Sequence, residues 1–172
     1  FKNETISWRA VAQPDFLELN DKLTSQELTF MSSPFILAAC AEMLWPTQPM
    51  AWRLKRLTEM GFQCGIWNWG NHDLGMLEKS GAVFSSMTGY VTGRLADDAG
   101  ADELLATAEQ SIEVGKRLNV ARLNLHGTGL GDRGLPVTPC ENVTPQMWLK
   151  ARDTLQRIAD LSEKHNVVFM LE

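Results

Sequence analysis

From residue 35 onward, the chain alternates short apolar runs with longer amphipathic stretches. This alternation is typical of strand-helix units that feed a parallel sheet, because strands covered on both faces read as nearly continuous apolar runs. The apolar runs predict five strands, at residues 35–44, 64–69, 82–87, 122–126 and 167–171. The stretches between them predict four helices, so the fold class is α/β with a parallel sheet.

The predicted helices have recognisable starts and ends. They are a helix that carries Trp52, Leu54 and Leu57 and ends at Gly61, one over 72–79, one over 102–118, and one that starts near Thr144 and Pro145. Residues 102–118 keep near-helical spacing of their apolar positions, which indicates a helix with one buried face. In the last helix, threonine suits the N-cap and proline suits the first turn.

Composition and charge narrow the possible functions. The chain has 172 residues, of which 44% are hydrophobic, with a net charge of -5 and a pI near 5.2. It therefore lacks the basic field that attracts nucleic acid, and no apolar run reaches the roughly 20 residues that cross a bilayer. The three cysteines form no Cys-x-x-Cys pair, so they indicate neither a disulfide framework nor a thiolate zinc site. We expect a cytoplasmic enzyme with a small-molecule substrate and no nucleic-acid or membrane partner.

The fourth predicted strand carries polar residues in alternation. Period-two geometry puts Arg122, Asn124 and His126 on one side and two leucines on the other. In a barrel wall the leucines would face the helices, and His126 would point inward at the carboxyl end of its strand. There it is a candidate substrate-binding residue, whereas the alternative is a hydrogen-bonded structural histidine.

The fifth predicted strand ends on a lone acid. The same parity places Val168, Met170 and Glu172 on one face, with Glu172 at the carboxyl end. Active-site barrels present catalytic and metal-binding groups in this way, and a carboxylate in a barrel mouth is costly unless a cation or partner meets it. Glu172 is thus the candidate catalytic and metal-binding residue; the alternative is an ordinary carboxylate in solvent.

Weaker candidates lie near the ends of the first and second strands. Glu42 interrupts an apolar run, where it either reaches the barrel mouth or lies on the surface at a frayed strand end. Trp45, Trp67 and Trp69 either stack on a substrate or complete the core. We count Glu42, Trp45 and Asn68 with His126 as candidate substrate-binding residues. The glycines of residues 127–131 do not have dinucleotide-fingerprint spacing, and no helix follows them closely.

Several of these segments resemble the xylose-isomerase-like barrel superfamily, and within it the hydroxypyruvate isomerase group. The resemblance covers residues 35–172. It is carried by Phe-Ile-Leu-Ala-Ala-Cys-Ala-Glu-Met-Leu-Trp at 35–45, Glu-Met-Gly-Phe-Gln at 59–63, Gly-Lys-Arg-Leu-Asn-Val at 115–120 and Val-Val-Phe-Met-Leu-Glu at 167–172. Two positions depart from the group's pattern. Its second strand usually begins with glutamate where this chain has Gly65 or Ile66, and its third strand often carries histidine where this chain has Ser86 or Met87.

The resemblance implies a (β/α)8 TIM barrel and a metal-dependent isomerase. In that family the acid that ends the fifth strand is both a divalent-metal ligand and one of two acid/base groups, which carries over to Glu172. The implied reaction moves a proton between adjacent carbons of a short hydroxy-keto acid or sugar through an enediolate, with Mn²⁺ or Mg²⁺, or else Zn²⁺, holding the oxygens. The second acid/base group and the other metal ligands are expected from strands six to eight.

Two further classes of function stay open. The superfamily also includes metal-dependent endonucleases for damaged DNA, in which His126 and Glu172 would bind zinc, as well as sugar epimerases and dehydratases. The remaining possibility is an incomplete barrel without activity.

Length sets the expected domain organisation. An eight-stranded barrel takes about 250 residues, so we interpret 31–172 as the N-terminal part of a TIM barrel with five strands and four helices. We expect its fifth strand to be an open edge that favours aggregation or pairing with another chain, and we expect its metal binding to be weak. The full-length protein is expected to form a homo-oligomer. Residues 1–30 show no strand signal, and we interpret them as an extension that can be removed without loss of the main core.

Overall fold

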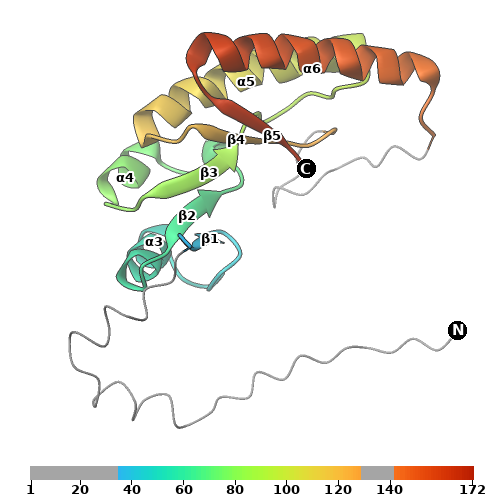
Figure 1. Ribbon diagram of the computed structural model, residues 1–172. Coiled ribbons are helices and arrows are strands. Elements are labelled where there is room, and N and C mark those ends of the chain that lie inside the picture. Colours follow the sequence, from blue (N-terminus) through green and yellow to red (C-terminus); the bar gives the residue numbers. More distant parts are fainter. Residues whose placement is uncertain (1–34, 129–141) are drawn as a thin grey trace, which may run out of the picture. The chain divides into compact units, whose positions relative to one another are not determined.

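The computed structural model describes residues 35–128 and 142–172 (Figure 1). The predicted extension at 1–30 lies outside the described residues, and Ile36–Glu172 forms one compact unit. Its elements are, in chain order, β1 (Ala38–Cys40), α3 (Met50–Glu59), β2 (Gln63–Ile66), the 3-10 helix η1 (Trp69–Asn71), α4 (Leu74–Lys79), β3 (Phe84–Thr88), α5 (Asp98–Leu118), β4 (Arg122–Leu125), α6 (Pro145–His165) and β5 (Val168–Leu171). In the described part of the chain, the five predicted strands and four predicted α-helices are thus confirmed.

All five strands are parallel and lie in the order β1-β2-β3-β4-β5. Crossovers between parallel neighbours are right-handed, so a sequential strand order puts every connecting helix on the same face of the sheet. The helices α5 and α6 pack against each other along this face, as Figure 1 shows. The arrangement is that of a barrel wall, an open segment of an α/β barrel. Because all strands run the same way, their carboxyl ends meet at one edge.

The first strand is much shorter than the predicted 35–44, which is a correction. Only Ala38–Cys40 pairs with β2, and the chain turns immediately afterwards. The turn is held by the guanidinium of Arg53 on α3, which donates to the carbonyl oxygens of Ala41, Glu42, Pro46 and Gln48 at 3.5, 3.3, 2.6 and 2.6 Å. The apolar run suggested a longer strand because hydrophobicity alone does not indicate that Arg53, and not a neighbouring strand, binds the carbonyl oxygens of these residues.

Both long helices are fixed by caps. In α5 the N-cap is Asp97, whose carboxylate accepts from the Gly100 amide at 2.8 Å, so the helix starts four residues before the predicted residue 102. In α6 the predicted N-cap and first-turn proline are confirmed, because the Thr144 hydroxyl accepts from the Met147 amide at 3.2 Å. Each of these helices ends at an asparagine in the left-handed region, the conformation that stops a helix and leads into the next strand.

The core lies between the sheet and the helices. Leu123 of β4 is fully buried against a cluster that includes Ile112 and Leu118 of α5, and Leu125 joins a second cluster with Leu104 and Ile158. The predicted parity of β4 is therefore confirmed, with its leucines toward the helices. Asn124 lies on the opposite side of the strand.

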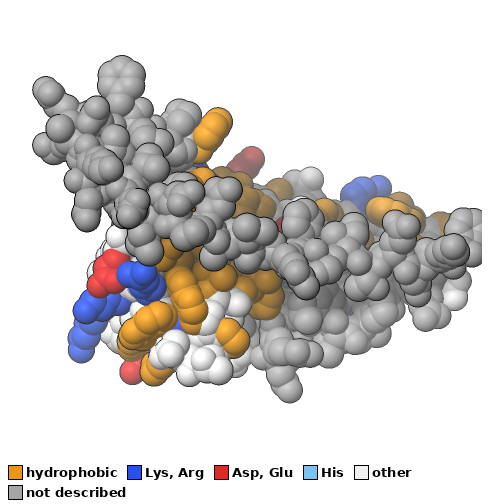
Figure 2. All heavy atoms as spheres, turned by 90° about the horizontal axis from the view of Figure 1, so that it is seen from below, with side chains coloured by type: hydrophobic (Ala, Val, Ile, Leu, Met, Phe, Trp, Pro, Cys, Tyr) orange, Lys and Arg blue, Asp and Glu red, His pale blue; other side chains and the backbone are white. Residues whose placement is uncertain are grey.

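The strand β5 forms one edge of the sheet, as predicted. Val168 and Leu171 each expose more than half of their surface, since no strand or helix of the described residues covers them. Hydrophobic side chains also gather on the face seen in Figure 2, beside Lys and Arg side chains. Among the described residues, no helix is both long enough and apolar enough to span a membrane.

Candidate active site at the strand ends

The carboxyl ends of β4 and β5 bring three polar side chains together. The Glu172 amide continues the parallel pairing by donating to the Leu125 carbonyl oxygen at 2.9 Å. Its carboxylate accepts from the Asn124 side-chain amide at 2.5 Å, and its other oxygen lies 3.6 Å from Nε2 of His126. The sequence prediction that Glu172 and His126 share one face on adjacent strands is confirmed.

Their exposure suits a reactive group. The Glu172 side chain is 51% exposed and the His126 side chain 21% exposed. A small molecule can therefore reach the carboxylate, beside which the imidazole is more deeply buried. Beside them, the side-chain oxygen of Asn124 is buried and has no hydrogen-bond partner among the described residues. Buried polar atoms are nearly always paired, so this oxygen is available to a donor group or a cation. Strand parity put Asn124 on this side, but no other sequence signal marked it.

Tyr90 holds the start of the loop that follows β4. Its hydroxyl donates to the carbonyl oxygen of Thr128, and the Leu95 amide donates to the carbonyl oxygen of Gly127 at 3.4 Å. These bonds fix the backbone directly after His126 and thereby hold the imidazole at the strand end. Burial raises the pKa of Tyr90 to about 12.

This environment gives a directly measurable result, because Tyr90 is the only tyrosine in the chain. An exposed tyrosine ionises near pH 10, whereas we expect Tyr90 to remain protonated until about pH 12. Absorbance of the phenolate at 295 nm checks this, with N-acetyltyrosinamide as the reference and circular dichroism reporting whether the chain is still folded. Phenolate formation in folded protein at pH 10 would contradict the buried placement.

A second group of polar contacts joins the ends of β1 and β2. The Glu42 carboxylate accepts from the backbone amides of Trp67 and Asn68, the latter at 3.2 Å, and lies 2.7 Å from Nε2 of His72. The side chains of Glu42 and His72 are only 16% and 15% exposed. Burial raises the pKa of Glu42, but the bonds from His72 and the two amides outweigh it, so the net pKa is lowered and the carboxylate is ionised near neutral pH.

Sequence reasoning named Glu42 in this group but missed His72. The sequence left two alternatives for Glu42, a position that reaches the barrel mouth and a surface position at a frayed strand end. Its largely buried side chain beside the end of β2 does not fit the surface position. No spacing links residues 42 and 72, because the pairing arises only when two neighbouring strands end side by side. The side chain of Asn68 caps η1 by accepting from the Gly70 amide at 2.9 Å, so its predicted contact with a substrate stays a prediction.

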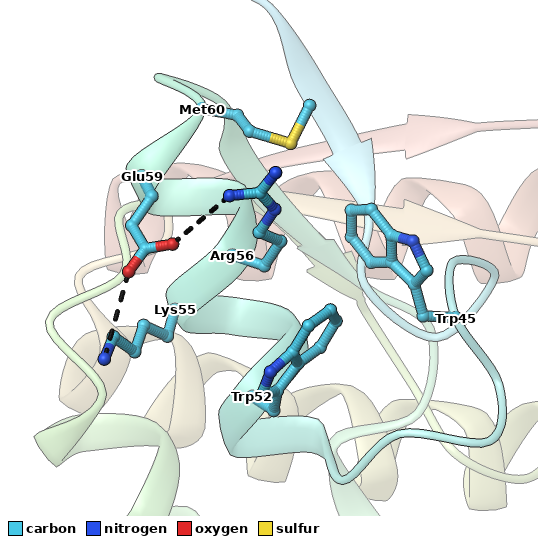
Figure 3. A pocket seen from close by; sticks show the side chains of 6 residues that line it. All are labelled: Trp45, Trp52, Lys55, Arg56, Glu59 and Met60. Carbon is cyan, nitrogen blue, oxygen red and sulfur yellow. Dashed lines mark ion pairs between the residues drawn. The ribbon is translucent and has the colours of Figure 1, made fainter.

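Trp45 lies in a different place from both groups. Its ring meets that of Trp52 edge to face, with centroids 5.6 Å apart, and both line a groove of about 580 Å³ along α3 (Figure 3). Lys55, Arg56 and Glu59 complete its polar side, with Glu59 3.9 Å from Lys55 and 3.6 Å from Arg56. The backbone of Trp45 is in the left-handed region, with φ 47°, which is rare for a bulky residue. Substrate stacking by Trp45 stays a prediction.

A complete metal site is not formed by the described residues. No group of three or more His, Cys, Asp or Glu side chains in 35–128 and 142–172 is arranged to hold a metal ion. Glu172 and His126 supply two neighbouring ligands of the right chemistry, and the unpaired Asn124 oxygen is a third possible donor. Mn²⁺ and Mg²⁺ take about six ligands, so these residues fit part of a coordination sphere.

Comparison with known proteins supports the architecture. No family model and no curated protein sequence matches the chain. Among solved structures, it is similar to a family 2 AP endonuclease from Brucella melitensis, with a TM-score of 0.65 and 11% identity over 79% of this chain and 54% of that one. It is also similar to the 3-keto-D-glucoside 4-epimerase of E. coli, with a TM-score of 0.56 and 14% identity over 78% of this chain and 54% of that one. A sugar phosphate isomerase/epimerase from Parabacteroides distasonis gives a TM-score of 0.57 and 12% identity over 82% of this chain and 52% of that one.

These similarities show the fold alone, which is that of an α/β TIM barrel. The chain spans about half the length of each of these structures. Five consecutive parallel strands in an open sheet agree with that share, because they make up five of the eight strands of a barrel. The predicted fold class, an incomplete TIM barrel, is confirmed.

Proposed function

We propose that this chain forms the five-stranded part of a metal-dependent isomerase of the hydroxypyruvate isomerase type, acting on a small hydroxy-keto acid or sugar. The observation that carries the proposal is the Glu172 carboxylate, which is half exposed at the end of β5 and oriented by Asn124 beside His126. Catalytic groups of TIM barrels lie at this edge of the sheet. Two of the similar structures are sugar epimerases or isomerases, which agrees with the proposed class.

The chemistry asked of these residues is proton transfer between adjacent carbons. Glu172 takes a proton from the carbon next to the carbonyl and returns it to the neighbouring carbon, which passes the substrate through an enediolate. The amide of Asn124 holds one carboxylate oxygen, so the other is directed toward the substrate. When bound, a divalent ion, Mn²⁺ or Mg²⁺ and alternatively Zn²⁺, supplies charge stabilisation for the substrate oxygens, with Glu172 among its ligands.

A second candidate is a metal-dependent endonuclease. It is favoured by the TM-score of 0.65 with the AP endonuclease and by the position of His126 beside Glu172, since both side chains are zinc-ligand types. The net charge of -5 weighs against it, because DNA binding depends on neutralising phosphates with basic side chains.

One experiment separates the two candidates. A complete barrel that carries this chain is incubated with hydroxypyruvate and Mn²⁺ in D₂O, and the C3 protons are followed by NMR. An isomerase exchanges them and forms tartronate semialdehyde. In parallel, the same preparation with Zn²⁺ is given an oligonucleotide with one abasic site. Cleavage of this DNA without proton exchange would replace the isomerase proposal by the endonuclease. The proposed isomerase acts in the cytoplasm, and its full-length form is a homo-oligomer.

The 172-residue chain by itself is expected to bind Mn²⁺ weakly and to show no turnover. The reason is that Glu172 and His126 provide only part of a coordination sphere. Isothermal titration with MnCl₂ checks the affinity, and the hydroxypyruvate assay checks activity. Tight stoichiometric binding together with turnover would show that these five strands suffice, which would contradict the incomplete-site interpretation.

A further inference from the structure

The Glu42 and His72 side chains form a carboxylate-imidazole pair that the proton transfer by Glu172 does not use. They join the ends of β1 and β2, whereas Glu172 and His126 lie at the ends of β4 and β5. All four residues are nevertheless at the same edge of the parallel sheet, since every strand runs in the same direction. In barrels of this kind, groups from several strand ends act on one substrate.

The pair fixes which nitrogen of His72 carries the proton. Glu42 is ionised and can only accept hydrogen bonds, so Nε2 of His72, at 2.7 Å, must be the protonated nitrogen. In the neutral imidazole this leaves a lone pair on Nδ1. No hydrogen bond to Nδ1 is made by any of the residues in 35–128 and 142–172. A carboxylate behind one nitrogen strengthens the other as a proton acceptor.

The pair is also held rigidly. Two backbone amides of the loop after β2 bind the Glu42 carboxylate, and Arg53 binds the Glu42 carbonyl oxygen at 3.3 Å. Next to His72, Asp73 is the N-cap of α4 and accepts from the Gly75 amide at 2.8 Å, which fixes the backbone that carries the imidazole.

We propose that His72 is a second acid/base residue, which accepts a proton at Nδ1 from a hydroxyl group of the substrate, and that Glu42 positions it. In this step the substrate O–H bond breaks and an N–H bond forms at Nδ1. The imidazolium is then paired with the Glu42 carboxylate, and the electron pair stays on the substrate oxygen. The reverse transfer restores both groups. The identity of the substrate as a small hydroxylated acid or sugar rests on the proposed function.

The tautomer is tested first in the unsubstituted chain, by long-range ¹⁵N–¹H NMR on the labelled protein, which has only three histidines. His72 is expected as the tautomer protonated at Nε2. Glu42→Gln should reduce this preference severalfold, whereas Glu59→Gln, on the exposed face of α3, should leave it unchanged. A His72 protonated at Nδ1 in the unsubstituted chain would overturn the inference.

The substrate contact is tested on a complete barrel that carries this chain, with the ¹⁵N label confined to these 172 residues, by titration with hydroxypyruvate and Mg²⁺. The Nδ1 resonance of His72 is expected to shift, whereas His165, which lies beside Lys116 on the helical side, should not move. If His126 shifts and His72 does not, the role of His72 is wrong and the proposed function stands. If neither shifts, both fail.

Discussion

Replacing Glu172 by glutamine is expected to lower kcat/KM of an active barrel containing this chain by about 100-fold or more, the usual contribution of a general acid/base. Glutamine keeps the size of the side chain and an oxygen that can accept the Asn124 amide bond, now 2.5 Å long. What it removes is the group that takes and returns the proton. The measurement is steady-state turnover of hydroxypyruvate together with C3 proton exchange in D₂O.

The matched control is Glu163→Gln, an exposed glutamate on α6 with the same change in charge. It should leave turnover and exchange unchanged. Thermal unfolding should be similar for both variants, because Glu172 is half exposed and its side chain contributes little burial. A Glu172→Gln enzyme that exchanges the C3 protons at the normal rate would show that another group performs the transfer.

The part of the site on β4 and β5 could be predicted because it depends on local geometry. Side chains of a strand alternate between its faces, so two leucines at 123 and 125 place Asn124 and His126 on the other side. In β5 every residue before Glu172 is apolar, so only the alternation of the strand itself puts Val168 and Met170 on the face of Glu172. Once the strands are known to be parallel neighbours, the contact between Glu172 and His126 follows without any further information.

The pair of Glu42 and His72 could not be predicted, because it depends on how two loops fold back. The carboxylate finds its partners 25 to 30 residues away, at the amides of the loop after β2 and the imidazole of His72. Nothing in the run around Glu42 indicates that the strand stops at Cys40, since the donors that bind the turn belong to Arg53 on the following helix. Hydrophobic patterning reports burial but not where a chain leaves the sheet.

The position of Trp45 shows the same limit. The backbone of Trp45 is left-handed and its ring lines the groove along α3, a placement that the sequence did not indicate, while its stacking on a substrate stays a prediction. The sequence contains no glycine or asparagine at that position to announce a left-handed residue. The direction of the Trp45 side chain therefore depends on a left-handed backbone conformation that is rare for tryptophan.

Gly93→Ala is expected to be the most destabilising single substitution considered, lowering the free energy of unfolding by more than about 3 kcal/mol. Gly93 has φ +105°, and a Cβ there would lie 2.2 Å from the Leu104 backbone nitrogen and 2.6 Å from the Gly100 carbonyl oxygen. Neither atom can move without displacing α5. The segment also carries Leu95, which holds the loop after His126, so the substitution should disturb the site as well. Urea unfolding followed by circular dichroism gives the measurement.

Gly81→Ala is the control that separates backbone strain from steric overlap. Gly81 also has a positive φ, +71°, but a Cβ there meets no atom within 4 Å. Alanine at Gly81 should therefore cost only the strain of a left-handed residue, roughly 1–2 kcal/mol. The difference between the two variants measures how closely the loop after β3 approaches α5. Equal unfolding midpoints for the two variants would mean that α5 does not lie against Gly93. The packing of α5 on this segment would then not hold the loop after His126 in place.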